Sequence, residues 1–163
     1  MKITRANRIK EYQYWGDVYT VAFDLTVKAI PPQPTSSKSI FRFTEGTEND
    51  RIPALFLTSK GEIMFANSKL GPYIFGIEVG KTYQMTIQHF KECKKYWYEI
   101  IVDGVSKFKI ENISPEIFSN VKFFAGDPWH EPFSSDYGSI CNVRIGKLKY
   151  VICLSVLPES LLG

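Results

Sequence analysis

Aromatic and acidic side chains are concentrated in one stretch of the chain, FFAGDPWHEPFSSDYGSICNVRI, which runs from Phe123 to Ile145. A carbohydrate site needs a flat ring for the apolar face of a sugar and polar side chains for its hydroxyl groups. Trp129 supplies such a ring, and carboxylates and a histidine surround it. The sequence therefore predicts a binding site in this loop, made by Asp127, Trp129, His130, Glu131, Asp136 and Tyr137.

The acids of this loop admit a second use, as ligands of a calcium ion. Ca²⁺ takes several oxygen ligands from carboxylates and backbone carbonyls. Asp127, Glu131 and Asp136 could provide them, although their spacing does not match a compact calcium loop. Calcium is the one cofactor that the sequence suggests.

The same loop also admits a structural interpretation. Pro128 and Pro132 would stiffen it. Trp129 and Phe133 would then fold back as a plug over one end of the fold, while Asp127 caps a turn. The sequence leaves the binding site and the plug open as alternatives.

Two further tryptophans lie outside the loop. Trp97 falls on the outward face of an expected strand, where it could be a second binding platform or a packed strand residue. Trp15 is expected to pack in the core or at a sheet edge.

The sequence gives little support for a catalytic site. Glycosidases place two carboxylates about 5 to 9.5 Å apart. Glu99 and Asp103 could share a strand face, but four residues of strand separate them by about 13 Å. Asp103 is also a turn residue, and the chain has no Gly-x-Ser-x-Gly motif for a nucleophilic serine. The sequence predicts a protein that is not an enzyme.

The elements that must position these residues are strands. Apolar and polar residues alternate with a period of two, as in a half-buried strand, along VYTVAFDLTVKAI, KTYQMTIQ and YWYEIIVDG. Lys60-Gly61 and Asp103-Gly104 mark hairpin turns. The pattern predicts an all-β sandwich of two antiparallel sheets.

Composition narrows the function classes. The 163 residues favour one domain, and the net charge of +3 argues against nucleic-acid binding. The basic segment Lys2–Lys10 is expected to be a solvated edge strand.

No apolar run is long enough to span a membrane, and the N-terminus lacks a signal-peptide pattern. The sequon Asn112-Ile113-Ser114 weighs lightly toward secretion.

The cysteine content does not indicate a disulfide framework, because the chain has only three cysteines. Cys141 and Cys153 could pair if their strands are adjacent. Cys93 lies in a charged turn and is expected to be a free thiol. Because the chain has only two histidines, the sequence does not support a zinc site built on His89 and Cys93.

The order of motifs resembles a known superfamily. An apolar strand, an Asp-Gly turn and a return strand span Ile100–Ile110. A strand and loop of the form V-K-x-F-A-x-D-P-W span Val121–Trp129, and G-x-I-x-N closes the pattern at Gly138–Asn142. Together these features resemble the laminin-G-like, concanavalin-A-like jelly roll in its animal extracellular variant, from about Tyr12 to Gly146.

This resemblance implies an antiparallel jelly roll over residues 1–150, followed by a C-terminal strand and tail over 151–163. It also implies an extracellular, lectin-like recognition module that binds a glycan. The alternative is an adhesion domain that binds protein partners, for which an exposed apolar patch or an edge-strand oligomer would argue. Trp15-Gly16-Asp17 only partly matches a galectin motif, so the sequence does not predict a galectin-type galactoside site.

Overall fold

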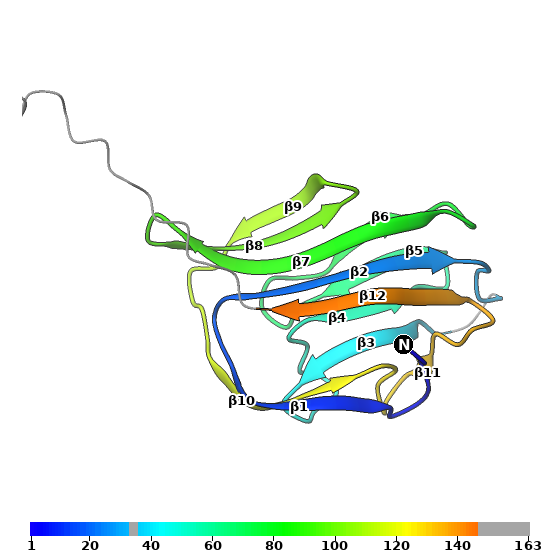
Figure 1. The fold of residues 1–163 in the computed structure, drawn as a ribbon, viewed down its shortest axis with the longest axis horizontal. Helices are drawn as coiled ribbons and strands as arrows, with labels where there is room; N and C mark the ends of the chain where they lie inside the picture. Colours follow the sequence, from blue (N-terminus) through cyan, green and yellow to red (C-terminus); the bar gives the residue numbers. More distant parts are fainter. Residues whose placement is uncertain (33–35, 147–163) are drawn as a thin grey trace, which may run out of the picture.

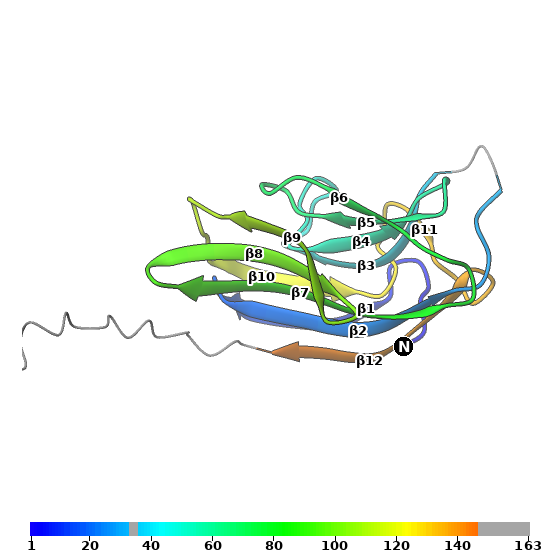
Figure 2. The same cartoon turned by 90° about the horizontal axis from the view of Figure 1, so that it is seen from above.

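Two β-sheets packed face to face make up the protein, as the computed structural model of residues 1–32 and 36–146 shows (Figures 1 and 2). One sheet has the order β1-β10-β3-β4-β5-β6, and β11 pairs with β3 beside this path. Its strands are β1 (Arg8–Trp15), β3 (Lys38–Thr44), β4 (Ala54–Leu57), β5 (Glu62–Ala66), β6 (Tyr73–Gly76), β10 (Phe118–Phe124) and β11 (Glu131–Pro132).

The other sheet has five strands in the order β12-β2-β7-β8-β9. These strands are β2 (Tyr19–Val27), β7 (Thr82–Glu92), β8 (Lys95–Val102), β9 (Val105–Glu111) and β12 (Gly138–Gly146). All pairings in the two sheets are antiparallel except the short parallel contact of β11 with β3. The predicted all-β antiparallel sandwich is confirmed.

The core lies between the sheets and follows the alternation in the sequence. Burial along β2 alternates without interruption, so that Val21, Phe23 and Leu25 face inward and the residues between them face outward. Phe43 on β3 and Phe123 on β10 stack with ring centroids 4.5 Å apart. Trp15 is buried against Phe43, which confirms its expected packing role.

Both predicted hairpins are present. Lys60-Gly61 joins β4 to β5, and Asp103-Gly104 joins β8 to β9. Asp103 and Gly104 both have positive φ, 49° and 77°, as a two-residue type I′ turn requires. The predicted N-terminal edge strand is found in part, since β1 begins only at Arg8 and pairs with β10 alone.

Connections gather at the two ends of the sandwich. One end holds the β3–β4, β5–β6 and β9–β10 connections, on the left in Figure 1. The other end holds the segment between β10 and β12, which includes β11. Strands β3 and β10 run between the two ends.

The cysteines differ from the prediction. Cys93 is disulfide-bonded, so the expectation that it is a free thiol is wrong. Cys141 is free and exposed and is therefore not paired with Cys153. Cys153, the boundary at residue 150 and the expected C-terminal strand lie outside the described residues. In the part of the chain that is described, no helix could cross a membrane.

Candidate functional site

Residues 125–137, between β10 and β12, form a segment that we call the aromatic loop. Asp127, its first acid, is fully buried and binds groups of the protein. Its Oδ2 lies 2.9 Å from Nε of Arg42, and both side chains are 0% exposed. Its Oδ1 accepts hydrogen bonds from the backbone N–H groups of Trp129 (3.0 Å) and His130 (2.8 Å). Burial acts to raise the pKa of Asp127, but the charge of Arg42 and the contacts with His130 outweigh it and hold the pKa below its ordinary value.

Arg42 is held between two aromatic rings. Its guanidinium carbon lies 5.4 Å from the centroid of Phe56 and 5.1 Å from that of Trp129, within the range of a cation–π contact. Its Nη1 donates to the carbonyl of Glu48 at 2.5 Å. Nε and Nη2 have no hydrogen-bond partner among the described residues, so the contact with Asp127 is an ion pair rather than an aligned hydrogen bond.

The remaining predicted residues of the loop are spread along it. Glu131 pairs with Lys38 at 3.3 Å, and Lys38 also lies over the ring of Tyr137. Asp136 is exposed and accepts a weak contact from Ser134 at 3.5 Å. Phe133, next to them, is fully buried in the central core. This geometry is that of the plug, which holds the loop against the sheet.

The three predicted calcium ligands do not converge. Within residues 1–32 and 36–146 there is no group of three or more acidic, histidine or cysteine side chains that could hold a metal ion. Asp127 in particular is turned inward to Arg42. The structure therefore does not bring Asp127, Glu131 and Asp136 together as a calcium site.

Trp97 lies on the other sheet, on the outward face of β8. It is partly buried, pairs in register with Glu111 of β9, and lies under the ammonium of Lys109, which is 4.9 Å from its ring centroid. The structure separates Trp97 from the loop around Trp129.

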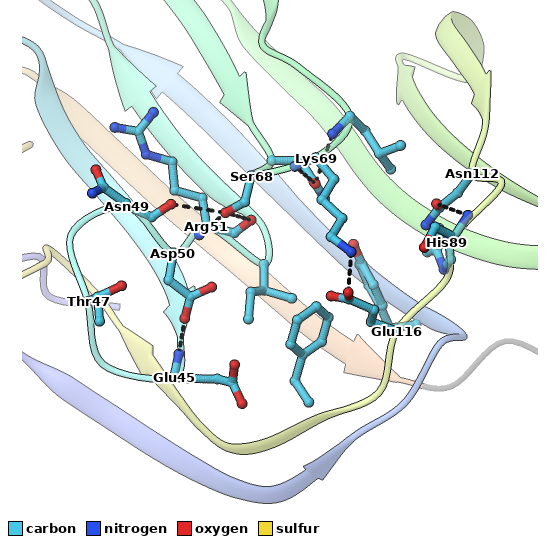
Figure 3. A pocket seen from close by; sticks show the side chains of 16 residues that line it. Glu45, Thr47, Asn49, Asp50, Arg51, Ser68, Lys69, His89, Asn112 and Glu116 are labelled. Atoms are coloured by element: carbon cyan, nitrogen blue, oxygen red, sulfur yellow. Dashed lines mark hydrogen bonds and ion pairs between the residues drawn. The ribbon is translucent and has the colours of Figure 1, made fainter.

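A cavity of about 350 Å³ opens at the opposite end of the sandwich (Figure 3). It is bounded by the β3–β4, β5–β6 and β9–β10 connections and by the ends of β2, β7 and β10. The lining residues are Tyr19, Glu45, Thr47, Asn49, Asp50, Arg51, Ile52, Asn67, Ser68, Lys69, Leu70, His89, Asn112, Ser114, Glu116 and Phe118. We call this cavity the end pocket.

Hydrogen bonds between loops fix the wall of the end pocket. Ser68 Oγ accepts from the backbone N–H of Arg51 at 2.6 Å and donates to the carbonyl of Asn49 at 3.1 Å, which ties the β5–β6 connection to β3–β4. Asp50 Oδ2 accepts from Thr44 Oγ1 at 3.1 Å and from the backbone N–H of Glu45. The wall is therefore preorganised, which lowers the entropy cost of binding.

His89 lines the pocket beside Asn112 and is 4% exposed. Its ring stacks between Tyr19 and Tyr96, with centroids 5.7 and 5.8 Å away. Nδ1 contacts the carbonyl of Asp17, and Nε2 lies 3.0 Å from Nδ2 of Asn112. Since a carbonyl can only accept, this geometry requires the neutral tautomer with the proton on Nδ1, and Nε2 then accepts from Asn112.

Electrostatics agree with this tautomer. Burial lowers the pKa of His89 and outweighs the opposing effect of Asp17, so the imidazole is neutral at pH 7. Both polar atoms of the Asn112 side chain are therefore hydrogen-bonded: Nδ2 donates to His89, and Oδ1 accepts from the backbone N–H of Ser114 at 3.1 Å.

The end pocket combines a ring with short polar groups. Phe118 at the start of β10 is partly buried and lines the cavity together with Asn67, Ser68 and Ser114. The sequence alone does not reveal this site, because its residues come from separate connections and form no motif. The only local signals are the polar segments 47–51 and 67–69, which are also typical of ordinary loops.

Comparison with known proteins identifies structural neighbours. No protein-family model and no curated protein matches the sequence. Among solved structures, the CBM40 domain of Ruminococcus gnavus IT-sialidase bound to α2,3-sialyllactose has a TM-score of 0.56 and 11% identity, with 91% of each chain covered. A structure described only as that CBM40 domain gives a TM-score of 0.53 at 12% identity, covering 90% of this chain and 92% of that one.

A Trypanosoma rangeli sialidase matches with a TM-score of 0.58 and 13% identity. The match covers 81% of this chain but only 21% of the sialidase, so this chain corresponds to about a fifth of that enzyme. The fold is an antiparallel jelly roll. The predicted fold class is confirmed, and the narrower resemblance to the animal laminin-G-like variant stays a prediction.

Proposed function

We propose that this protein is a non-catalytic carbohydrate-binding module and that the end pocket holds the glycan. The observation that carries the proposal is the cavity of about 350 Å³ with a ring and several short polar side chains at its wall. That combination suits the apolar face and the hydroxyl groups of a sugar. A structural neighbour of nearly the same length, described as a CBM40 domain bound to sialyllactose, supports the ligand class.

The absence of catalysis is part of the proposal. Glu99 hydrogen-bonds Gln88 at 2.6 Å, and Asp103 Oδ1 accepts from the backbone N–H of Gln84 at 2.9 Å. Within the pocket, Glu116 is paired with Lys69, and Asp50 accepts two hydrogen bonds within its own loop. These carboxylates are occupied in supporting the structure rather than poised as a general acid and a nucleophile.

A protein-binding adhesion domain is the second candidate. Ile113 and Ile117, on the β9–β10 connection at the rim of the pocket, are 90% and 57% exposed, and exposed apolar residues are found at protein interfaces. An extracellular location is proposed for either function. The disulfide at Cys93 supports it, because disulfides persist in oxidising compartments.

The test removes one ring at each of three places. Purified wild type and the variants Phe118→Leu, Trp129→Ala and Trp97→Ala are applied to a glycan array, each after its folding has been checked by circular dichroism. We expect binding to fall about fivefold in Phe118→Leu, which removes a stacking ring worth on the order of 1 kcal/mol. Trp129→Ala and Trp97→Ala should bind as wild type does.

The other outcomes either place the glycan site in another part of the molecule or overturn the proposal. Loss confined to Trp129→Ala places the site in the aromatic loop, and loss confined to Trp97→Ala places it on the outer face of β8. No glycan bound by folded wild type, with or without calcium, overturns the proposal and favours the adhesion domain. Release of free sugar from any array glycan overturns the non-catalytic part.

A further inference from the structure

An ion pair crosses between two walls of the end pocket. Lys69 of the β5–β6 connection contacts Glu116 of the β9–β10 connection through its ammonium, and the two side chains are 45% and 43% exposed. Figure 3 shows Lys69 extending toward Glu116, whose carboxylate meets its amino group. The positive charge of Lys69 is therefore already matched by a carboxylate of the protein.

The other basic side chain of the wall is turned elsewhere. The guanidinium of Arg51 lies 5.5 Å from the ring of Phe56, which packs with Ala54 and Ala66 in a cluster separate from the central core. In Figure 3 the guanidinium of Arg51 points away from Lys69 and Glu116. The charge of Arg51 therefore lies with Phe56.

Two carboxylates of the wall are not matched by a basic side chain of the protein. Neither Glu45 nor Asp50 has an ion-pair partner in the described parts of the chain. The nearby ammonium of Lys122 contacts the backbone carbonyl of Glu45 at 3.3 Å. The buried His89 is neutral, so it adds no positive charge.

From this arrangement we infer that the end pocket selects uncharged glycans over carboxylated ones, and that Glu116 sets this selectivity by occupying Lys69. The inference rests on the proposed function and names the ligand class for that site. The expected ligand class differs from the ligand of the neighbouring CBM40 structure, because sialyllactose carries a carboxylate.

The physical reason is a competition for one cation. A sugar carboxylate that approaches Lys69 must displace Glu116 and then lie beside it, and like charges at short distance repel. The hydroxyl groups of a neutral sugar instead donate hydrogen bonds to carboxylates, and such charge-assisted bonds are stronger than neutral ones. The same wall therefore attracts one class and disfavours the other.

The experiment compares matched glycans on matched variants. Wild type, Glu116→Gln and Glu11→Gln are screened on an array that carries each neutral glycan beside its sialylated and uronate-containing forms. The best pair is then titrated by calorimetry at low salt. Glu11→Gln is the control, because it removes the same charge from an exposed ion pair with Arg8 on β1, and neither residue lines the pocket.

In wild type and Glu11→Gln we expect the neutral member to bind at least tenfold more tightly. In Glu116→Gln, where Lys69 is released, the ratio should fall to threefold or less through a gain in affinity for the anionic glycan. Tighter binding of the anionic member by wild type overturns this inference and leaves the proposed function standing. An unchanged ratio in Glu116→Gln overturns the role of Glu116, and no binding of any glycan overturns the proposed function itself.

Discussion

The two ends of the sandwich use similar residue types for different purposes. The aromatic loop after β10 places Asp127 and Trp129 against Arg42 of β3, and Arg42 and Asp127 are both fully buried. The end pocket also holds rings, carboxylates and basic residues, but it encloses open volume. Side chains in close contact leave no room for a ligand in the aromatic loop, whereas the end pocket leaves a space that a ligand can enter.

The largest expected effect tests the loop as a structural element. Asp127→Ala leaves the buried charge of Arg42 uncompensated and the backbone N–H groups of Trp129 and His130 without their acceptor. We expect the free energy of unfolding to fall by about 3 to 5 kcal/mol, the range found when one partner of a buried pair is removed. Urea denaturation followed by tryptophan fluorescence measures it.

The matched control is Asp136→Ala, which removes an exposed acid from the same loop and should change stability by less than about 0.5 kcal/mol. If Asp127→Ala instead keeps its stability and loses glycan binding, the two ends have been assigned the wrong roles.

A pair of glycine substitutions compares backbone tolerance at the two ends. Gly126 beside Asp127 has φ +85°, and a Cβ there would lie 2.4 Å from the carbonyl oxygen of Thr4. Gly71 in the β5–β6 connection has φ +72° and open space around it. We expect Gly71→Ala to cost about 1 kcal/mol through backbone conformation alone, and Gly126→Ala clearly more because of the clash. Thermal unfolding of both variants measures this, and equal losses would show that the loop is less tightly held than its contacts indicate.

The pH dependence of stability probes the pocket wall. The pKa of His89 is lowered in the folded protein, so the unfolded chain binds the proton more readily. The contribution of neutral His89 is therefore complete above the unfolded pKa of about 6.5 and is lost as the pH falls below it toward the lowered folded value. We expect wild type to lose stability between pH 7.5 and 5 more steeply than His89→Gln.

Urea denaturation at intervals across that range gives the comparison. Parallel pH profiles for the two proteins would remove His89 from this role. The pKa of Asp127 is also lowered, so its stabilisation is lost only at more acidic pH, near and below about 4, and does not obscure the histidine.

Much of the fold could be predicted from the sequence, because alternation and turn chemistry are local. The period of two along Val21–Val27 and the Asp103-Gly104 turn specify strands and a hairpin without tertiary information. The disulfide of Cys93 could not be predicted in this way, since a pairing depends on distances between strands that are distant in sequence.

The candidate site was harder to predict for the same reason. Trp129 and its neighbours are conspicuous in the sequence, but their pairing with Arg42 depends on how β3 lies beside β10. The end pocket is assembled from residues as far apart as Tyr19 and Phe118, none of them unusual in its own segment. Residue types alone draw attention to the aromatic loop, but whether its side chains contact one another or surround an open cavity depends on the tertiary arrangement.

The most direct test of the difference between the two ends is a heteronuclear NMR titration of the wild-type protein with the strongest array glycan. We expect backbone amide shifts to change at Ser68, Lys69 and Asn112, around the end pocket, with the indole signal of Trp129 unmoved. Shifts confined to Trp129 and His130 would contradict this assignment and make the aromatic loop the binding site.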